Sequence, residues 1–331
     1  GIRDFCLARG LGDVYKRQLQ VGKLVAFMEY LFHAMFSVML FCMVFMLYPR
    51  ASISAKRIMA VLNTETSIEN HPGNAQTDSG SGEHSVIFEH VDFVYPDGEE
   101  AVLKDISFSA KSGETVAFIG STGSGKSSLI QLIPRFYDRA SGNIYIDGQK
   151  IEDLDINALR SKIGFVPQKA HLFSGTIEEN IRFGKPDATM DEIIHAAKIA
   201  QAYDFIMEKP HQFQEQIVEG ATNVSGGQKQ RLSIARALIR KPEIYIYDDS
   251  FSALDFKTDA RLRKALKPEI KNAIVFLVAQ RVSTILDADK IVVLDEGKIA
   301  GIGTHRELLA SCPIYYEIAA SQLSKEELTY A

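Results

Sequence analysis

A glycine-rich segment with a single lysine lies between two apolar stretches. The run TVAFIG leads directly into GSTGSGKSS, so Gly120, Gly125, Lys126 and Ser127 fit the pattern GxxxxGK[ST] between a strand and a helix. Glycines let backbone amides converge on phosphate oxygens, the lysine adds positive charge, and the serine hydroxyl can ligate Mg²⁺. The segment predicts a phosphate-binding loop rather than an ordinary glycine turn. Its members are Gly120, Ser121, Thr122, Gly123, Ser124, Gly125, Lys126, Ser127 and Ser128.

A pair of carboxylates follows another apolar run. EIYIYDD carries four consecutive apolar or aromatic residues that end at Asp248. Such a strand presents its last carboxylate at the edge of a parallel sheet where ligands bind, which suits coordination of Mg²⁺. Acidic pairs after strands are common, so this signal gains its weight from the phosphate-binding loop in the same chain.

A second candidate phosphate site lies in VSGGQKQRLSIARALIRKP. Ser225, Gly226, Gly227 and Gln228 open an expected helix that ends at Pro242. Exposed amides, a serine hydroxyl and the positive end of the helix dipole would then face one point. The glycine loop needs only one nucleotide, so this second site makes most sense if it closes on a nucleotide held by another subunit.

The remaining pattern predicts an α/β fold. TVAFIG, EIYIYD, AIVFLVA and KIVVLD are fully apolar runs separated by helical segments, which is typical of a parallel sheet covered on both faces. Earlier runs, VIFEHVDFVY and VLKDISFSA, are β-rich, and Ile106, Phe108 and Ala110 of the second run alternate as in a half-buried strand.

An apolar segment near the N-terminus differs from the rest of the chain. Residues 24–48 include one formal charge, Glu29, and would form a helix about 37 Å long, enough to cross a membrane. Arg50, Lys56 and Arg57 follow, so the positive-inside rule places the later residues in the cytoplasm. One span cannot make a pore, so we expect it to be the last transmembrane helix of a longer, multi-pass protein of the plasma membrane.

The other boundaries follow from composition. Residues 1–18 are expected to be a non-native scar, 19–62 the transmembrane helix with its cytosolic extension, and 63–85 a polar linker. Residues 86–320 form the nucleotide-binding domain and 321–331 a tail. A net charge of −5 argues against nucleic-acid binding, and three widely spaced cysteines exclude a disulfide scaffold.

Six motifs agree in order and spacing with one family. Tyr95, GSTGSGKSS, Gln168 in VPQKAHLF, VSGGQ, YDDSFSALD and FLVAQRVST together resemble the nucleotide-binding domain of ATP-binding cassette (ABC) transporters. With the apolar helix in front, the chain looks like part of a multidrug-type exporter half-transporter. The resemblance covers residues 19–320. It implies a P-loop NTPase domain of the ABC type, with antiparallel β and helical subdomains, preceded by one transmembrane helix.

The resemblance also implies roles for individual residues. Tyr95 would stack on adenine, and the glycine loop, which is the Walker A motif, would hold the phosphates of ATP. Gln168 would join Ser127 and Asp248 around Mg²⁺. Residues 169–224 would be a helical subdomain that docks on the membrane part. Contacts with a partner subunit would come from Ser225, Gly226, Gly227 and Gln228, and from the loop Ser252, Ala253, Leu254 and Asp255.

Two positions depart from the family pattern. Asp249 stands where the family has a glutamate that polarises the attacking water, so the reach of the carboxylate falls by about 1.5 Å, which can cost around 10²-fold in rate. Gln280 stands where the family has a histidine that contacts the γ-phosphate, and glutamine carries no charge. Both changes fall in the catalytic set Lys126, Gln168, Asp249 and Gln280.

The sequence therefore predicts an ABC exporter ATPase with ATP and Mg²⁺ as ligands. Its own ATP site is expected to be slow, and its SGGQ element to complete the site of a second half-transporter in a heterodimer. The alternatives are a homodimer with ordinary turnover and a non-hydrolytic ATP clamp. The exported substrate would be a small molecule, lipid or peptide.

Overall fold

The computed structural model describes residues 21–64, 66, 68, 70 and 84–323. The chain divides into two compact units, residues 1–67 and 68–331, and each is described here by itself. The expected scar at 1–18, most of the linker and most of the tail lie outside the described residues.

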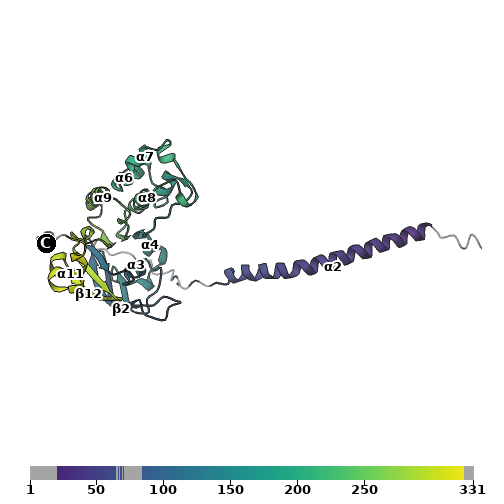
Figure 1. Ribbon diagram of the computed structural model, residues 1–331, viewed down its shortest axis with the longest axis horizontal. Coiled ribbons are helices and arrows are strands. Elements are labelled where there is room, and N and C mark those ends of the chain that lie inside the picture. Colours follow the sequence, from purple (N-terminus) through teal and green to yellow (C-terminus); the bar gives the residue numbers. More distant parts are fainter. Residues whose placement is uncertain (1–20, 65, 67, 69, 71–83, 324–331) are drawn as a thin grey trace, which may run out of the picture. The chain divides into compact units, whose positions relative to one another are not determined.

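The first unit contains one long helix, α2 (Val21–Leu62), of 42 residues (Figure 1). No residue of this helix is buried, and its most apolar 18-residue window has a mean hydropathy of 2.1. Pro49 lies inside the helix without ending it. By length and composition α2 can cross a membrane. At 1.5 Å per residue it is about 63 Å long, roughly twice the thickness of a hydrocarbon core.

The second unit is built on a six-stranded sheet with strand order β12-β11-β3-β10-β9-β6. All neighbouring pairs are parallel except β11 and β12. The four apolar runs expected to form a parallel sheet are β3, β9, β10 and β11, which confirms that prediction. The bounds are β3 (Thr115–Gly120), β6 (Ile163–Val166), β9 (Ile244–Asp248), β10 (Ile274–Val278), β11 (Lys290–Asp295) and β12 (Lys298–Gly303).

A second, antiparallel sheet has the order β2-β1-β4-β5. The two early β-rich runs predicted its strands β1 and β2. This sheet packs its apolar side chains on one face of the central sheet, where Phe108 lies edge-on to Phe118 with ring centroids 5.5 Å apart. The bounds are β1 (Ser85–Phe93), β2 (Leu103–Lys111), β4 (Ser141–Ile146) and β5 (Gln149–Lys150).

Helices cover the opposite face of the central sheet. Alternation along β9 divides its side chains between two cores, with Ile244 and Ile246 toward the antiparallel sheet and Tyr245 and Tyr247 toward the helices. The helices α6, α7 and α8 lie together in one lobe (Figure 1).

The helices are α3 (Lys126–Leu132), α4 (Ile156–Ser161), α5 (Ile177–Arg182), α6 (Met190–Ile199), α7 (Tyr203–Met207), α8 (Gly226–Leu238), α9 (Phe256–Glu269), α10 (His305–Ser311) and α11 (Pro313–Ala320). The short elements are β7 (Gly175–Thr176), β8 (Gln216–Ile217), η1 (Ile151–Asp153), η2 (Gln212–Gln214), η3 (Glu219–Ala221) and η4 (Val282–Thr284).

Helix α8 is shorter than the sequence predicts. It ends at Leu238, four residues before Pro242. Proline forbids continuation of a helix but does not require that the helix reach it. Here the backbone turns at Lys241, whose φ is +48°, and β9 then begins at Ile244.

Strand β1 begins at Ser85, one residue before the predicted start of the nucleotide-binding domain. The Ser85 amide donates to Asp147 Oδ1 at 3.0 Å. Burial acts to raise the pKa of Asp147, but hydrogen bonds from Lys162 and the Ser85 amide lower it below its usual value. This carboxylate therefore fixes the start of the strand.

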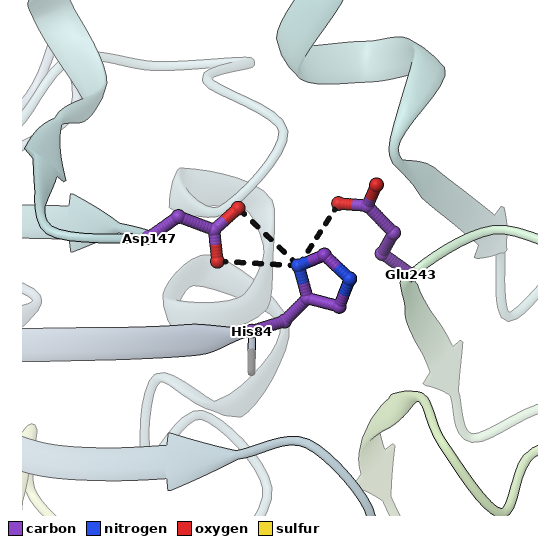
Figure 2. Close-up of side chains that lie close together, drawn as sticks. All are labelled: His84, Asp147 and Glu243. Atoms are coloured by element: carbon purple, nitrogen blue, oxygen red, sulfur yellow. Dashed lines mark hydrogen bonds and ion pairs between the residues drawn. The ribbon is translucent and has the colours of Figure 1, made fainter. Parts of the chain in front are cut away.

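Figure 2 shows His84, Asp147 and Glu243 at the same place. His84 Nδ1 lies 3.4 Å from Asp147 Oδ1 and 3.3 Å from Glu243 Oε2, close enough for the three side chains to share a metal ion. However, the Lys162 ammonium already lies 2.7 Å from Asp147 Oδ2 and 3.0 Å from Glu243 Oε2. The cation that these carboxylates need is supplied by the chain, so we interpret the cluster as a structural ion-pair network.

Candidate functional site

The glycine loop connects β3 to α3 as the motif requires. Gly125 precedes the helix with φ +95°, a conformation that favours glycine. A Cβ at Gly120 would collide with the carbonyl oxygen of Leu294 on the neighbouring strand β11. The loop is therefore held tightly against the sheet at the N-terminus of α3.

Lys126 folds back over this loop. Its Nζ donates to Ser121 O at 2.6 Å, Gly120 O at 2.9 Å and Ser124 Oγ at 3.2 Å. Burial lowers the pKa of Lys126, while Asp249 and Asp248 act to raise it. The ammonium is thus placed among neutral oxygen acceptors, from which it can turn to phosphate oxygens.

A pocket of about 240 Å³ opens at this point. It unites most of the predicted ATP-binding and catalytic side chains at the carboxyl edge of the central sheet, where α/β folds place ligands. Its lining consists of Val102, Gly120, Thr122, Gly123, Gly125, Lys126, Ser127, Ser128, Gln168, Asp248, Asp249, Val278 and Gln280. Val102 and Val278 carry no motif, so the sequence analysis did not single them out.

Two of the three predicted Mg²⁺ ligands are in direct contact. Ser127 Oγ donates to Asp248 Oδ1 at 2.9 Å, and Gln168 lines the same pocket. Burial raises the pKa of Asp248, an effect that the hydrogen bond from Ser127 partly offsets. Hydroxyl, carboxylate and amide oxygens are the ligands that Mg²⁺ prefers, and a cation would relieve the buried charge of Asp248. The residues therefore fit this metal.

The two unusual residues, Asp249 and Gln280, contact each other. Gln280 Nε2 donates to Asp249 Oδ2 at 2.7 Å, and Gln168 Nε2 donates to the same oxygen at 3.3 Å. Sequence reasoning treated the two departures as separate substitutions in one site and missed this bond. The signal that could have found it is the shared edge of two neighbouring strands, because Val278 of β10 pairs with Asp248 of β9.

Asp249 has an unusual backbone conformation and a buried side chain. Its φ of +47° is uncommon for a residue with a side chain. Burial raises its pKa, while hydrogen bonds from Ser252 and Gln168 act to lower it. A carboxylate with a raised pKa beside the phosphate loop is suited to accept a proton.

Tyr95 lies beside the loop without lining the pocket. Its hydroxyl lies 2.8 Å from Ser128 Oγ, and its ring meets Tyr137 edge-on, with centroids 5.1 Å apart. This places an aromatic ring next to the first turn of α3.

Ser225, Gly226, Gly227 and Gln228 form the start of α8 in a capping box. Gln228 N donates to Ser225 Oγ at 3.3 Å, and Ser225 N donates to Gln228 Oε1 at 3.0 Å. Ser225 is exposed, and a Cβ built on Gly226 meets no atom within 4 Å. None of the four residues lines the pocket described above.

The loop from Ser252 to Asp255, which is predicted to face a partner subunit, contacts Asp249 and also approaches the start of α8. Ser252 Oγ donates to the carbonyl of Asp249 at 2.8 Å, and Asp255 caps α9 by accepting from Thr258 N at 2.9 Å. Ser252 and Ala253 are exposed, whereas Leu254 is buried. A Cβ on Gly227 would lie 3.2 Å from the carbonyl oxygen of Ala253, so this loop also approaches the start of α8.

Comparison with known proteins gives one family match. Residues 103–252 match the family model described as ABC transporter. This range includes the glycine loop, Gln168, the start of α8 and Asp248.

Similar curated proteins have the same description. The chain is 43% identical over 308 residues to an uncharacterized ABC transporter ATP-binding protein of Mycobacterium tuberculosis (strain ATCC 25618 / H37Rv), covering 92% of this chain and 52% of that protein. It is 44% identical over 307 residues to another such protein of Bacillus subtilis (strain 168), covering 93% and 52%. A protein of Staphylococcus aureus (strain NCTC 8325 / PS 47), provisionally named multidrug export ATP-binding/permease protein, is 48% identical over 237 residues, covering 72% and 41%.

A solved structure of a bacterial Atm1-family ABC exporter with ATP bound matches with a TM-score of 0.79 and 35% identity. The match covers 86% of this chain and 49% of the exporter chain. The chain therefore spans about half the length of the proteins it resembles.

Proposed function

We propose that this chain, which carries an ABC-type ATP-binding domain, binds and hydrolyses ATP with Mg²⁺ to drive export of a substrate across a membrane. The observation that carries this proposal is the pocket that unites the glycine loop with Gln168, Asp248 and Asp249. Similarity to an ATP-bound Atm1-family exporter and to a protein provisionally named for multidrug export supports the direction of transport.

The chemistry would be attack of water on the γ-phosphorus of ATP, with ADP as the leaving group. Lys126 and the amides of the glycine loop would hold the phosphate oxygens and stabilise their charge. Ser127, Gln168 and Asp248 would hold Mg²⁺, which when bound neutralises charge on the phosphate oxygens. Asp249 would orient the water and accept its proton. Tyr95 would stack on the adenine.

We further propose that this ATP site turns over slowly. The shorter Asp249 carboxylate is bonded to Gln280 at 2.7 Å, which holds it toward the end of β10. The attacking water must be aligned closely with the γ-phosphorus. A carboxylate that is one methylene shorter and held away from this water can therefore lower the rate by about 10²-fold. Glutamine also cannot give the γ-phosphate the positive charge that a protonated histidine supplies.

The start of α8 would act on a nucleotide held by a second subunit. Ser225 and Gly226 are exposed and do not line this chain's own pocket, so an ATP sandwich between two domains would use them. We propose that the partner is a second half-transporter, favoured as a different chain whose hydrolytic residues are intact. The loop from Ser252 to Asp255 would touch the same partner.

The length and apolar composition of α2 suggest how the chain relates to a membrane. We propose that it is the last transmembrane helix of a multi-pass protein in the plasma membrane, with its C-terminal turns and the ATP-binding domain in the cytoplasm. Residues 169–224, which include α5, α6 and α7, would contact the membrane part and transmit closure of the ATP sandwich. Closure and reopening would alternate access to the substrate, a small molecule, lipid or peptide.

A second candidate function is a non-hydrolytic ATP clamp. The bond between Gln280 and Asp249 favours it, because it engages one oxygen of the carboxylate that would accept the proton. Slow hydrolysis and a pure clamp differ in single-turnover release of phosphate.

The subunit arrangement can be tested by cross-linking the full chain in lipid nanodiscs. Thr122→Cys and Ser225→Cys would be introduced after Cys6, Cys42 and Cys312 are replaced, and ATP and a mild oxidant would be added. Retention of ATP without an ATP-dependent disulfide between copies supports the heterodimer. An ATP-dependent disulfide dimer contradicts it and indicates a homodimer, whereas loss of ATP on washing contradicts the ATP-binding proposal itself. Lys150→Cys with Ser225→Cys is the matched control.

A further inference from the structure

A second pocket lies between α9 and the central sheet. Its volume is about 430 Å³, within the range of small-molecule sites. Leu266 and Ile270 line it from the helix side, and Val275 and Leu277 line it from β10. It shares no lining residue with the pocket at the glycine loop. We refer to it as the α9 pocket.

Tyr247 contributes a buried donor to the α9 pocket. The side chain is 1% exposed, and its hydroxyl has no hydrogen-bond partner within the described part of the chain. The centroid of its ring lies 6.1 Å from that of Tyr245, in a stacked arrangement, and 5.2 Å from that of Phe251. These contacts hold the ring, and with it the hydroxyl, in place. Burial raises the pKa of Tyr247 well above its usual value, which keeps the proton available for donation. A buried hydroxyl without a partner is costly, and an acceptor on a ligand would remove this cost.

Arg263 offers another unpaired donor at this pocket. Its Nη2 bonds Asp259 at 3.1 Å and its Nη1 bonds the Ser283 carbonyl at 3.3 Å, whereas its Nε is buried without a partner among the described residues. Two exposed cations, Lys264 and Lys267, also line the pocket, whereas its lining includes a single carboxylate, that of Asp287. The polar part of the lining is thus predominantly cationic and rich in donors.

We propose that the α9 pocket binds an amphipathic carboxylate, a molecule with an apolar body and one anionic head, such as a medium-chain fatty acid. The apolar body packs between Leu266 and Val275. The carboxylate of the ligand accepts hydrogen bonds from the Tyr247 hydroxyl and Arg263 Nε. The ammonium groups of Lys264 and Lys267 attract its negative charge. Two residues of the α9 pocket are close in sequence to the proposed Mg²⁺ ligand and water-activating residue, because Tyr247 directly precedes Asp248 and Phe251 follows Asp249 by two residues.

Binding of radiolabelled decanoate would test this proposal. The full chain in phosphatidylcholine nanodiscs is dialysed against decanoate, the signal of empty nanodiscs is subtracted, and 1-decanol serves as the neutral probe. We expect saturable decanoate binding that is tighter than binding of decanol. Tyr247→Phe removes only the hydroxyl and should weaken binding about fivefold. Tyr245→Phe, on the same strand and outside the pocket lining, should leave it unchanged.

The charge requirement has its own matched pair on one helix. Lys264→Gln with Lys267→Gln should weaken decanoate binding about threefold to tenfold. Lys257→Gln with Arg261→Gln removes two cations of α9 that do not line the pocket and should have no effect. Absence of saturable binding, equal affinity for decanol, or equal responses of the two members of either pair would overturn the proposal.

Discussion

The glycine loop and the hydrolytic pair lie in one pocket but differ in how far they keep their expected chemistry. Lys126 and Ser127 contact the groups that a phosphate and Mg²⁺ site needs, including Asp248 at 2.9 Å from Ser127. By contrast, Asp249 and Gln280 bond each other at 2.7 Å. We infer from this difference that nucleotide binding and nucleotide hydrolysis depend on different residues, and we propose that hydrolysis is weakened while binding is retained.

The largest expected effect is on the binding side of this comparison. Lys126→Ala should lower the affinity for ATP by about 100-fold, because the half-buried ammonium is the one cation among the residues lining the pocket at the glycine loop. A fluorescent ATP analogue titrated into the chain measures this effect. Lys150→Ala, an exposed residue of β5, is the control. Unchanged affinity for ATP in Lys126→Ala would contradict the proposal that the glycine loop retains its ATP-binding role.

A smaller effect is expected at the start of α8. Gly226→Ala should leave the fold and the chain's own ATP affinity unchanged, since the added Cβ meets no atom within 4 Å. In the assembled transporter it should lower ATP turnover by about tenfold, because the methyl group stands where the partner's phosphates approach a helix N-terminus. Turnover and ATP affinity are measured on the same preparation. A fall in the chain's own ATP affinity would indicate that these residues act on its own site.

The smallest effect concerns stability. Burial raises the pKa of Asp249, so folding favours its protonated form. Such a carboxyl contributes stability below its unfolded pKa, and this contribution is lost as the pH rises through the folded pKa. At pH 7 the ionised group is therefore destabilising, and Asp249→Asn should raise Tm by a few degrees.

Calorimetry of Asp249→Asn at pH 7 and near pH 3 would measure this difference, which should vanish at the lower pH, where both states are protonated. Asp153→Asn, at an exposed position, is the control. A lower Tm at pH 7 would show that the bond to Gln280 stabilises the ionised carboxylate more than burial opposes it.

The sequence predicted the central sheet well because strands buried on both faces are continuous apolar runs, as in TVAFIG and AIVFLVA. It also placed Asp248 at the ligand edge, since the strand before it is unmistakable. The end of α8 was predicted too late, because Pro242 limits a helix without defining its last turn.

The contacts within the site required the fold. Gln280 and Asp249 are 31 positions apart, and only the parallel register of β9 and β10 brings their side chains together. The α9 pocket also arises from packing between α9 and the sheet, and so does the Tyr247 hydroxyl that has no partner among the described residues; YIYDD alone gives no pattern for either.

The central claim is that this chain holds ATP but hydrolyses it slowly because of Asp249 and Gln280. The most direct test compares steady-state ATP turnover of the unaltered chain with that of Asp249→Glu combined with Gln280→His, with both single variants as controls and ATP retention measured after washing. We predict that all four retain ATP and that the double variant is about 10²-fold faster than the unaltered chain. Robust turnover by the unaltered chain alone, or no gain in a double variant that still retains ATP, would contradict the claim.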